Sequence, residues 1–310
     1  MSNKIATREA YGKALVKLGK MNDKVVVLDA DLSKSTKTND FLKAYPNRFF
    51  NMGIAEQNLV GAACGFAAAG KIPFASTFAM FATGRAFEVI RNSVCYPKLN
   101  VKICATHAGI TVGEDGGSHQ SVEDISLMRS IPNMTVLVPA DGVEAEKMIF
   151  AAAEFDGPMY VRLGRSAVPT IFGEDYNFEV GKGVVLREGK DVTIIACGIM
   201  VNEAIIAADM LKEENIDARV INMSTIKPID TELIINASKE TKAIVTAEEH
   251  SIIGGLGSAV SEVVSENHPV VVKKVGMNDC FGESGTPNEL LEKYSLTAKN
   301  IVEKVKEALK

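Results

Sequence analysis

Short apolar runs alternate with amphipathic stretches along the whole chain. Runs rich in Val and Ile predict buried strands, and windows with apolar residues three or four positions apart predict helices that cover them. In the first half, strands are expected at residues 24–29, 72–75, 101–106, 135–138 and 159–162. Helices are expected at residues 7–20, from about 54, at 81–95 and at 143–153. This alternation indicates an α/β fold with mainly parallel sheets that are flanked by helices.

A stretch rich in Gly, Pro, Asp and Asn interrupts this pattern between residues 169 and 189. A second series follows, with strands at 192–196, 218–221, 243–246 and 270–273, and with helices that include 256–265 and 297–309. A chain of 310 residues also exceeds the usual size of one hydrophobic core. We therefore expect two α/β domains, at residues 1–172 and 188–310, joined by a linker at 173–187.

The composition narrows the class of protein. Hydrophobic residues make up 46% and charged residues 24% of the sequence, and the net charge of -5 offers no basic surface for nucleic acid or anionic lipid. No apolar run approaches the ~20 residues that span a bilayer, and the N-terminal stretch lacks the apolar core of a secretion signal. The five cysteines are scattered without a Cys-x-x-Cys pair, which favours reduced thiols over disulfides or a zinc site. We expect a cytoplasmic protein with no nucleic-acid or membrane partner.

One acidic residue, Glu56, lies in a segment that is otherwise small and apolar, from residue 54 to 69. The glycines of this segment would let another backbone or a flat ligand come close. A Glu in the first turn of a helix is often only a partner of the helix dipole, and that interpretation stays open. Downstream, a stripe of aromatic residues either packs in the core or forms a platform for a cofactor ring; its members are Phe74, Phe78, Phe81 and Phe87.

A glycine-rich loop follows the predicted strand at 101–106 and contains His107, Glu114, Asp115 and His119. Glycines let such a loop fold around a small ligand, and His with Asp can exchange protons or bind sugar hydroxyls near neutral pH. The spacing of the two histidines lacks the i,i+4 geometry of a helical metal site, so we assign no metal ligands. The loop could also be a structured surface segment without a ligand.

Two other features have both a functional and a structural interpretation. Arg162 ends the strand at 159–162 and Arg165 follows it; both suit phosphate, although an Arg at a strand end commonly pairs with an acidic side chain. The Gly-rich segment at 253–258 precedes a helix and could seat an anion, but the full dinucleotide fingerprint is missing. We interpret this segment as a tight strand–helix turn, and His250 as a structural residue.

Two motifs together carry a family resemblance: Phe50-Asn-Met-Gly-Ile-Ala-Glu-Gln-Asn and Gly113-Glu-Asp-Gly-Gly-Ser-His-Gln-Ser-Val-Glu. With these two motifs in this order, the sequence resembles the C-terminal half of transketolase, a member of the thiamine-diphosphate enzyme superfamily. The resemblance runs from about Ala6 through the last helix. The resemblance implies a pyrimidine-binding domain followed by a transketolase C-terminal domain. It also implies transfer of a two-carbon ketol unit from a ketose phosphate to an aldose phosphate.

The resemblance assigns cofactor-binding roles to four residues. Glu56 is implied to hydrogen-bond N1′ of the aminopyrimidine of thiamine diphosphate, which favours the imino tautomer that takes the proton from the thiazolium C2. Phe81 and Phe78 are implied to stack on the pyrimidine, and Asp31 matches an acidic residue near the cofactor. Gly84 stands where transketolases often have a further aromatic residue, and this departure is expected to loosen the fit of the cofactor.

The resemblance also implies roles for substrate-binding residues. Asp115 matches the residue that reads the C2 hydroxyl of the substrate, and His119 matches one close to the reacting carbon of the cofactor, so Glu56 and His119 are the implied catalytic pair. The positions that match the sugar-phosphate site are Arg8, Ser35, His107 and Arg165.

The Gly-Asp-Gly motif that binds the diphosphate and its metal in this superfamily is missing from the sequence. We therefore expect a separate N-terminal subunit to bring the diphosphate domain with Mg²⁺ or Ca²⁺. The active site would then form at the interface, within a heterotetramer that has two copies of each chain. The surfaces of the Glu56 helix and of residues 78–95 would be covered in that assembly.

Three other kinds of protein could share this fold, and each differs from the sequence in one respect. The beta subunit of a 2-oxo acid dehydrogenase shares the layout but has no use for a phosphate cluster. Deoxyxylulose-phosphate synthase is expected to carry an acid in place of His107. A non-catalytic subunit that kept the fold would have no need to retain Glu56, His107, Asp115 and His119 together.

Overall fold

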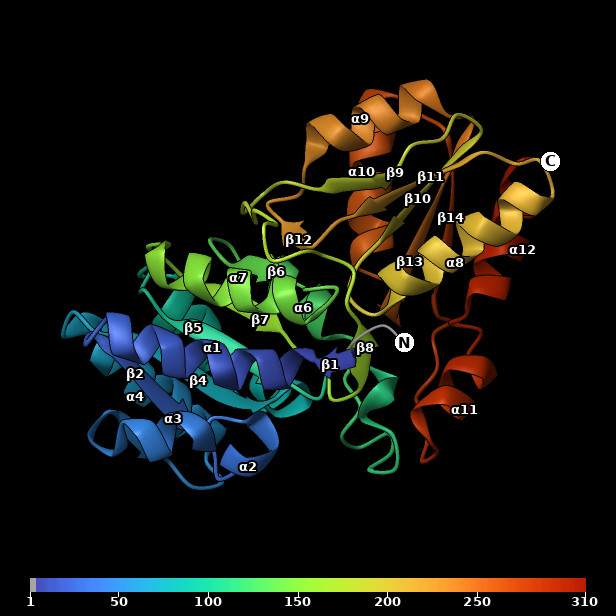
Figure 1. Cartoon of the computed structure of the whole chain (residues 1–310). Coiled ribbons are helices and arrows are strands. Elements are labelled where there is room, and N and C mark those ends of the chain that lie inside the picture. The colour runs from blue at the N-terminus through green and yellow to red at the C-terminus, as the bar shows by residue number, and fades with distance from the viewer. Residues whose placement is uncertain (1–3) are drawn as a thin grey trace.

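The computed structural model describes residues 4–310, so the first three residues of the predicted first domain lie outside the described residues. Figure 1 shows two α/β units, each a sheet with helices on its faces; the N-terminal one is blue to green and the C-terminal one yellow to red. The first half is built on a seven-stranded sheet and the second on a five-stranded sheet. The predicted α/β fold with mainly parallel sheets is confirmed. No helix in the described part of the chain is long and apolar enough to cross a membrane.

The first sheet has the strand order β12-β6-β7-β5-β4-β2-β3, and all of its neighbours pair in parallel except β12 with β6. Its central strands are buried on both faces, which is why they read as continuous apolar runs in the sequence. The strands are β2 (Val25–Asp29), β3 (Phe49–Asn51), β4 (Ile72–Phe78), β5 (Lys102–Thr106), β6 (Thr135–Leu137), β7 (Met159–Arg162) and β12 (Thr225–Lys227).

Helices cover both faces of this sheet. On one face α1 (Thr7–Met21) packs beside α7 (Gly142–Glu154), as Figure 1 shows, and both contribute to one apolar cluster. On the other face lie α4 (Glu56–Ala68), the helical turns of residues 81–95 and α6 (Asp124–Ser130). The shorter elements are α2 (Ser33–Thr36), α3 (Asn39–Ala44), α5 (Phe87–Val89), η1 (Pro46–Arg48), η2 (Phe81–Arg85), η3 (Ile90–Cys95) and η4 (Ile110–Val112).

The second sheet has the order β14-β13-β10-β11-β9, parallel except for β9 with β11. One face is covered by α8 (Met200–Glu213) and α12 (Ala298–Ala308), and the other by α9 (Thr231–Glu240) and α10 (Leu256–Asn267). The strands are β9 (Val184–Arg187), β10 (Val192–Ala196), β11 (Ala218–Asn222), β13 (Ala243–Ser251) and β14 (Val271–Met277). The remaining elements are α11 (Pro287–Lys293) and the antiparallel pair β1 (Lys4–Ala6) and β8 (Ala167–Pro169).

The structure differs from the sequence-based expectations in three places. Strand β9 lies in the stretch predicted to be a linker, where it forms the half-buried edge of the second sheet. Strand β12 belongs to the second half of the chain but pairs with β6 of the first sheet. The helix predicted at 81–95 contains two π-helical stretches, η2 and η3, in place of a continuous α-helix. Stretches of π-helix commonly occur at functional sites.

Candidate active site

The carboxyl ends of β2, β4 and β5 lie at one edge of the first sheet, where open α/β folds bind their ligands. Asp29 ends β2 and is fully buried, and its carboxylate accepts hydrogen bonds from Thr36 Oγ1 at 2.7 Å and Thr38 Oγ1 at 2.9 Å. These bonds hold the segment that contains Ser35 over the sheet edge. The chain then enters the glycine-rich loop after β5 at His107, whose backbone takes a left-handed conformation with φ of 57°.

Glu56 is the first residue of α4 and only 5% exposed. Its Oε1 accepts a hydrogen bond from Nη1 of Arg85 at 3.1 Å. The same guanidinium lies 4.3 Å from the centroid of the Phe81 ring, in cation–π contact. A cavity of about 430 Å³ opens here and is lined by residues 55–58 and by Arg85. Arg85 is a site residue that the sequence reasoning missed, because nothing in the order of residues connects it with Glu56.

Two aromatic rings and two histidines form a stacked group beside this cavity. The Phe78 ring stacks on His107 with centroids 3.8 Å apart and lies nearly parallel to the Phe81 ring at 6.0 Å. His119 presents its ring edge to Phe81 at 5.3 Å. The structure therefore brings together Phe78, Phe81, His107 and His119, which lie on three different segments of the chain.

Arg8 joins this group from α1. Its Nη1 donates to the Ser35 carbonyl oxygen at 2.8 Å and to Nε2 of His107 at 3.2 Å. Because Nε2 accepts, the ring proton of His107 is on Nδ1, which donates to Thr106 Oγ1 at 2.8 Å. Burial lowers the pKa of His107 to about 3, and the nearby cations Arg8 and Arg165 act in the same direction. His107 is therefore neutral at physiological pH, and the arginines supply the positive charge of this group.

Arg165 follows β7 and contacts the glycine-rich loop. Its Nη1 donates to the Val112 carbonyl oxygen and to Oε2 of Glu114 at 2.9 Å. Burial lowers the pKa of Arg8, and the next contribution comes from Arg165, so the two cations share one neighbourhood. Asp115 is exposed on the loop next to Glu114.

Asp31 follows the carboxyl end of β2, two residues after Asp29. It is exposed, has φ of 63°, and accepts a hydrogen bond from Nδ2 of Asn51 at 2.8 Å. Gly84 is exposed, and a Cβ at this position would stand 2.9 Å from the terminal methyl group of Met80. A Cβ at position 84 would therefore need only a shift of the flexible Met80 side chain.

Arg162 is not available to a ligand. It is 6% exposed, and its Nε donates to Oδ2 of the fully buried Asp124 at 2.7 Å. Of the two arginines weighed for phosphate, Arg165 alone lies beside His107 and Arg8. No group of three or more His, Cys, Asp or Glu side chains within residues 4–310 is placed to hold a metal ion.

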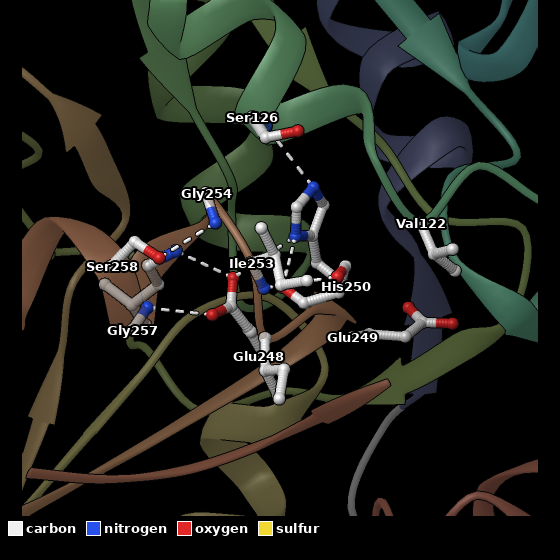
Figure 2. Close-up of polar contacts among 12 residues, drawn as sticks. Val122, Ser126, Glu248, Glu249, His250, Ile253, Gly254, Gly257 and Ser258 are labelled. Atoms are coloured by element: carbon white, nitrogen blue, oxygen red, sulfur yellow. Dashed lines mark hydrogen bonds and ion pairs between the residues drawn. The ribbon is translucent and has the colours of Figure 1, made fainter. Parts of the chain in front are cut away.

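The Gly-rich turn before α10 is satisfied by a side chain of the same domain. Figure 2 shows Glu248, which extends from β13 toward the start of α10 and accepts from the backbone N–H groups of Leu256 at 2.7 Å and Gly257 at 2.8 Å. An external anion would compete with this buried carboxylate for the same N–H groups. The turn therefore has a structural role, as a tight connection between strand and helix, which agrees with the interpretation from the sequence. Nε2 of the buried His250 accepts from the Ser126 N–H, which ties β13 to α6.

Two family models match the chain. The transketolase pyrimidine-binding domain matches residues 3–170, and the transketolase C-terminal domain matches residues 181–301. The chain belongs to the transketolase family. The resemblance predicted from the two sequence motifs is thereby confirmed.

The relatives differ in how much of their own length the chain covers. A protein of Methanocaldococcus jannaschii named as a transketolase C-terminal section is 53% identical, over 98% of this chain and 96% of that protein. A 6-deoxy-6-sulfo-D-fructose transketolase subunit of Clostridium sp. is 45% identical, over 95% of this chain and 92% of that subunit. A solved structure described as a split gene transketolase, inactive beta4 tetramer, is 62% identical with a TM-score of 0.91 over 99% of both chains. By contrast, the chain spans 49% of the rat and human transketolases that it matches.

Proposed function

We propose that this chain is the C-terminal subunit of a two-chain transketolase, active only with an N-terminal subunit. The full-length match to a transketolase C-terminal section supports this, because the mammalian transketolases contain a further half that this chain does not match. The related split gene transketolase is described as inactive when it is a beta4 tetramer. That description fits an active site to which a second kind of chain contributes.

The residues present fit the aminopyrimidine of thiamine diphosphate. Such a ring needs a carboxyl group at its edge and a flat apolar surface against its face. Glu56 and Phe81 provide these two groups. The planar guanidinium of Arg85 now lies between them, 3.1 Å from the Glu56 carboxylate and 4.3 Å from the centroid of the Phe81 ring. A planar group between these two side chains therefore contacts both at once. The Arg85 side chain is 54% exposed and can move aside for a ring.

Each residue of the site has a separate role in the proposal. Glu56 holds a proton at N1′, and Phe81 with Phe78 orients the pyrimidine. Bound thiamine diphosphate supplies the carbon nucleophile that takes up the two-carbon unit. His119, whose ring meets the Phe81 ring in a T-shaped contact, is proposed to reach the reacting end of a substrate. Asp31 is proposed to lie near the cofactor, and the metal, Mg²⁺ or Ca²⁺, to belong to the N-terminal subunit.

The substrate is proposed to be a sugar phosphate. Arg8 and Arg165 provide two cations near the neutral His107, and arginine forms charge-assisted, often bidentate hydrogen bonds with phosphate. Ser35 lies against Arg8 and completes this group. Asp115, exposed on the same loop, is proposed to read the C2 hydroxyl of the ketose.

The assembly and the domain limits are also proposals. We propose that residues up to 172 belong to the pyrimidine-binding domain and that the C-terminal domain begins before residue 188, because β9 belongs to the second sheet. The matched ranges of 3–170 and 181–301 support this division. A cytoplasmic heterotetramer with two copies of each chain would give two shared sites.

A second candidate substrate comes from the relative named for 6-deoxy-6-sulfo-D-fructose. A sulfonate is also an anion that arginine binds, so the same cationic group suits it. A comparison of kcat/KM for a ketose phosphate and a ketose sulfonate decides between the two. A phosphate substrate predicts at least a tenfold preference for the ketose phosphate.

The observation that carries the proposal is the buried Glu56 beside an aromatic face. Glu56→Gln, mixed with the N-terminal subunit, should lower kcat by about 10² to 10⁴, the usual contribution of a positioned acid–base group. The stability of the variant should be unchanged, because the substitution weakens only the hydrogen bond between position 56 and the half-exposed Arg85. Glu146→Gln is the matched control, since it removes a partly exposed carboxylate of α7 that pairs with Lys17 of α1, on the face of the sheet opposite α4. Near-normal turnover by Glu56→Gln would defeat the assignment.

A further inference from the structure

The segment of residues 107–120, here called the substrate loop, carries His107, Asp115 and His119. It leaves β5 at Thr106 and rejoins regular structure at α6. Between these points its only regular element is the short turn η4. A loop of this kind keeps its side chains in place only when contacts outside the loop offset the entropy of ordering it. Residues 163–166 of the first domain supply some of those contacts, and the C-terminal domain supplies others.

Glu249 of β13 supports the first part of the substrate loop. Its carboxylate Oε1 accepts a hydrogen bond from the Thr111 N–H at 2.7 Å, and both residues are buried. Figure 2 shows Glu248 and Glu249 pointing to opposite sides of β13, with Glu248 directed at α10. Gly109 lies directly on the Glu249 carboxylate: a Cβ there would stand 2.2 Å from the carboxyl carbon, and φ is 80°. The backbone of the loop therefore rests on this side chain.

The end of the substrate loop is tied to the same strand. Arg162 Nη2 donates to the Glu249 carbonyl oxygen at 2.9 Å and to the Ser121 carbonyl oxygen at 3.3 Å. The Ser251 N–H donates to the Val122 carbonyl oxygen at 2.7 Å. Strand β13 of the C-terminal domain thus holds both the first part of the loop, at Thr111, and the residue Val122 just after it.

Gln120 connects the middle of the loop with residues 278–286 of the C-terminal domain. Its Nε2 faces three carbonyl oxygens, those of Glu283 at 2.9 Å, Ile110 at 3.1 Å and Gly113 at 3.4 Å. Three acceptors around one atom identify it as the amide nitrogen. The Gln120 side chain is 3% exposed, so this bridge is shielded from water.

Glycines on both sides of this contact let the two backbones touch. A Cβ at Gly117 would stand 2.8 Å from the Gly282 carbonyl oxygen, and one at Gly282 would stand 1.9 Å from Oε1 of Gln120. A Cβ at Gly116 would stand 2.5 Å from Oγ of Ser284. The part of the loop between Asp115 and His119 therefore has little freedom to move relative to the C-terminal domain.

We propose that the C-terminal domain positions the substrate loop, with Glu249 and Gln120 as positioning residues that fix where His107, Asp115 and His119 meet the substrate. The inference rests on the proposed function for the meaning of these three side chains. Glu56 and Phe81 lie on α4 and η2, which neither positioning residue contacts among the described hydrogen bonds. We therefore expect the C-terminal domain to act more strongly on sugar binding than on pyrimidine binding, because the loop meets the pyrimidine side only through the ring contacts of His107 and His119 with Phe78 and Phe81.

The experiment uses the full chain mixed with the N-terminal subunit. Gln120→Leu removes the three-carbonyl bridge, and Glu249→Leu removes the acceptor for the Thr111 N–H. Each should raise KM for the ketose phosphate at least tenfold and leave the Kd of thiamine diphosphate within about twofold of wild type. Glu249→Gln keeps a carbonyl oxygen for the Thr111 N–H and should restore most of the lost affinity for sugar. Lys293→Ala is the control, since it removes only an exposed ion pair with Glu283 in the adjoining segment.

Hydrogen–deuterium exchange of the chain alone provides a readout without catalysis. Amides of residues 109–120 should exchange at least tenfold faster in Gln120→Leu, while those of α4 keep their wild-type rates. Unchanged exchange, or a parallel loss of cofactor and sugar affinity, overturns the inference. If Glu249→Leu does not fold, Gln120→Leu and the exchange rates still decide. Absence of ketol transfer by the wild-type mixture would instead refute the proposed function, and the exchange result would remain interpretable.

Discussion

Replacing His107 by asparagine should make the stability of the chain less sensitive to acid. His107 is 3% exposed, and burial lowers its pKa from 6.5 to about 3. The native protein keeps the ring neutral, whereas the unfolded chain takes up a proton below pH 6.5. The wild type therefore loses stability as the pH falls from 6.5 toward 3. Linkage between these two pKa values gives a loss of about 2 kcal/mol at pH 5 relative to pH 8.

Urea unfolding of the wild type and His107→Asn at pH 8 and pH 5 measures this effect. Glu144 titrates in the opposite sense, because burial raises its pKa to about 7 and its ionisation destabilises the native state as the pH rises. Both proteins contain Glu144, so the difference between their pH dependences isolates His107. The free energy of unfolding should fall by about 2 kcal/mol less in the variant than in the wild type. Equal pH dependence in the two proteins would refute a neutral, buried His107.

Two further predictions concern the arginines at the end of β7 and just after it. Arg165→Ala should raise KM for phosphorylated sugars roughly ten- to a hundredfold, the cost of losing a charge-assisted hydrogen bond; equal losses on an unphosphorylated sugar would reject its phosphate role. Asp124→Asn should cost about 3–5 kcal/mol in urea unfolding, because it leaves the buried Arg162 charge without its partner. A cost below about 1 kcal/mol would show that water reaches this ion pair.

Much of the first sheet could be predicted because buried parallel strands require continuous apolar runs. The run at residues 24–29 leads to β2, and its position in the sheet follows from the alternation of strands and helices. The grouping of Phe78, Phe81, His107 and His119 was also accessible, through two motifs that identify the family. The roles assigned to all of these side chains, and to Glu56, Arg8, Arg165, Asp31, Asp115 and Ser35, stay predictions, since only a bound ligand can test them.

The features that could not be predicted depend on contacts between distant residues. Apolar spacing does not distinguish an α-helix from one with π-helical stretches, so η2 and the approach of Arg85 to Glu56 were hidden. The pairing of β12 with β6 joins residues from the two halves of the chain, and β12 itself is only three residues long. The contact between Glu249 and Thr111 spans 138 positions and has no signal in either local sequence.

The central claim is that Glu56 completes a thiamine diphosphate site only together with an N-terminal subunit that carries Gly-Asp-Gly. Isothermal titration of thiamine diphosphate with Mg²⁺ into this chain, into that subunit and into their mixture tests it most directly. Tight binding and ketol transfer are expected in the mixture, and neither is expected for this chain alone. Full activity of the isolated chain, or a mixture that binds no more cofactor than its parts, would contradict it.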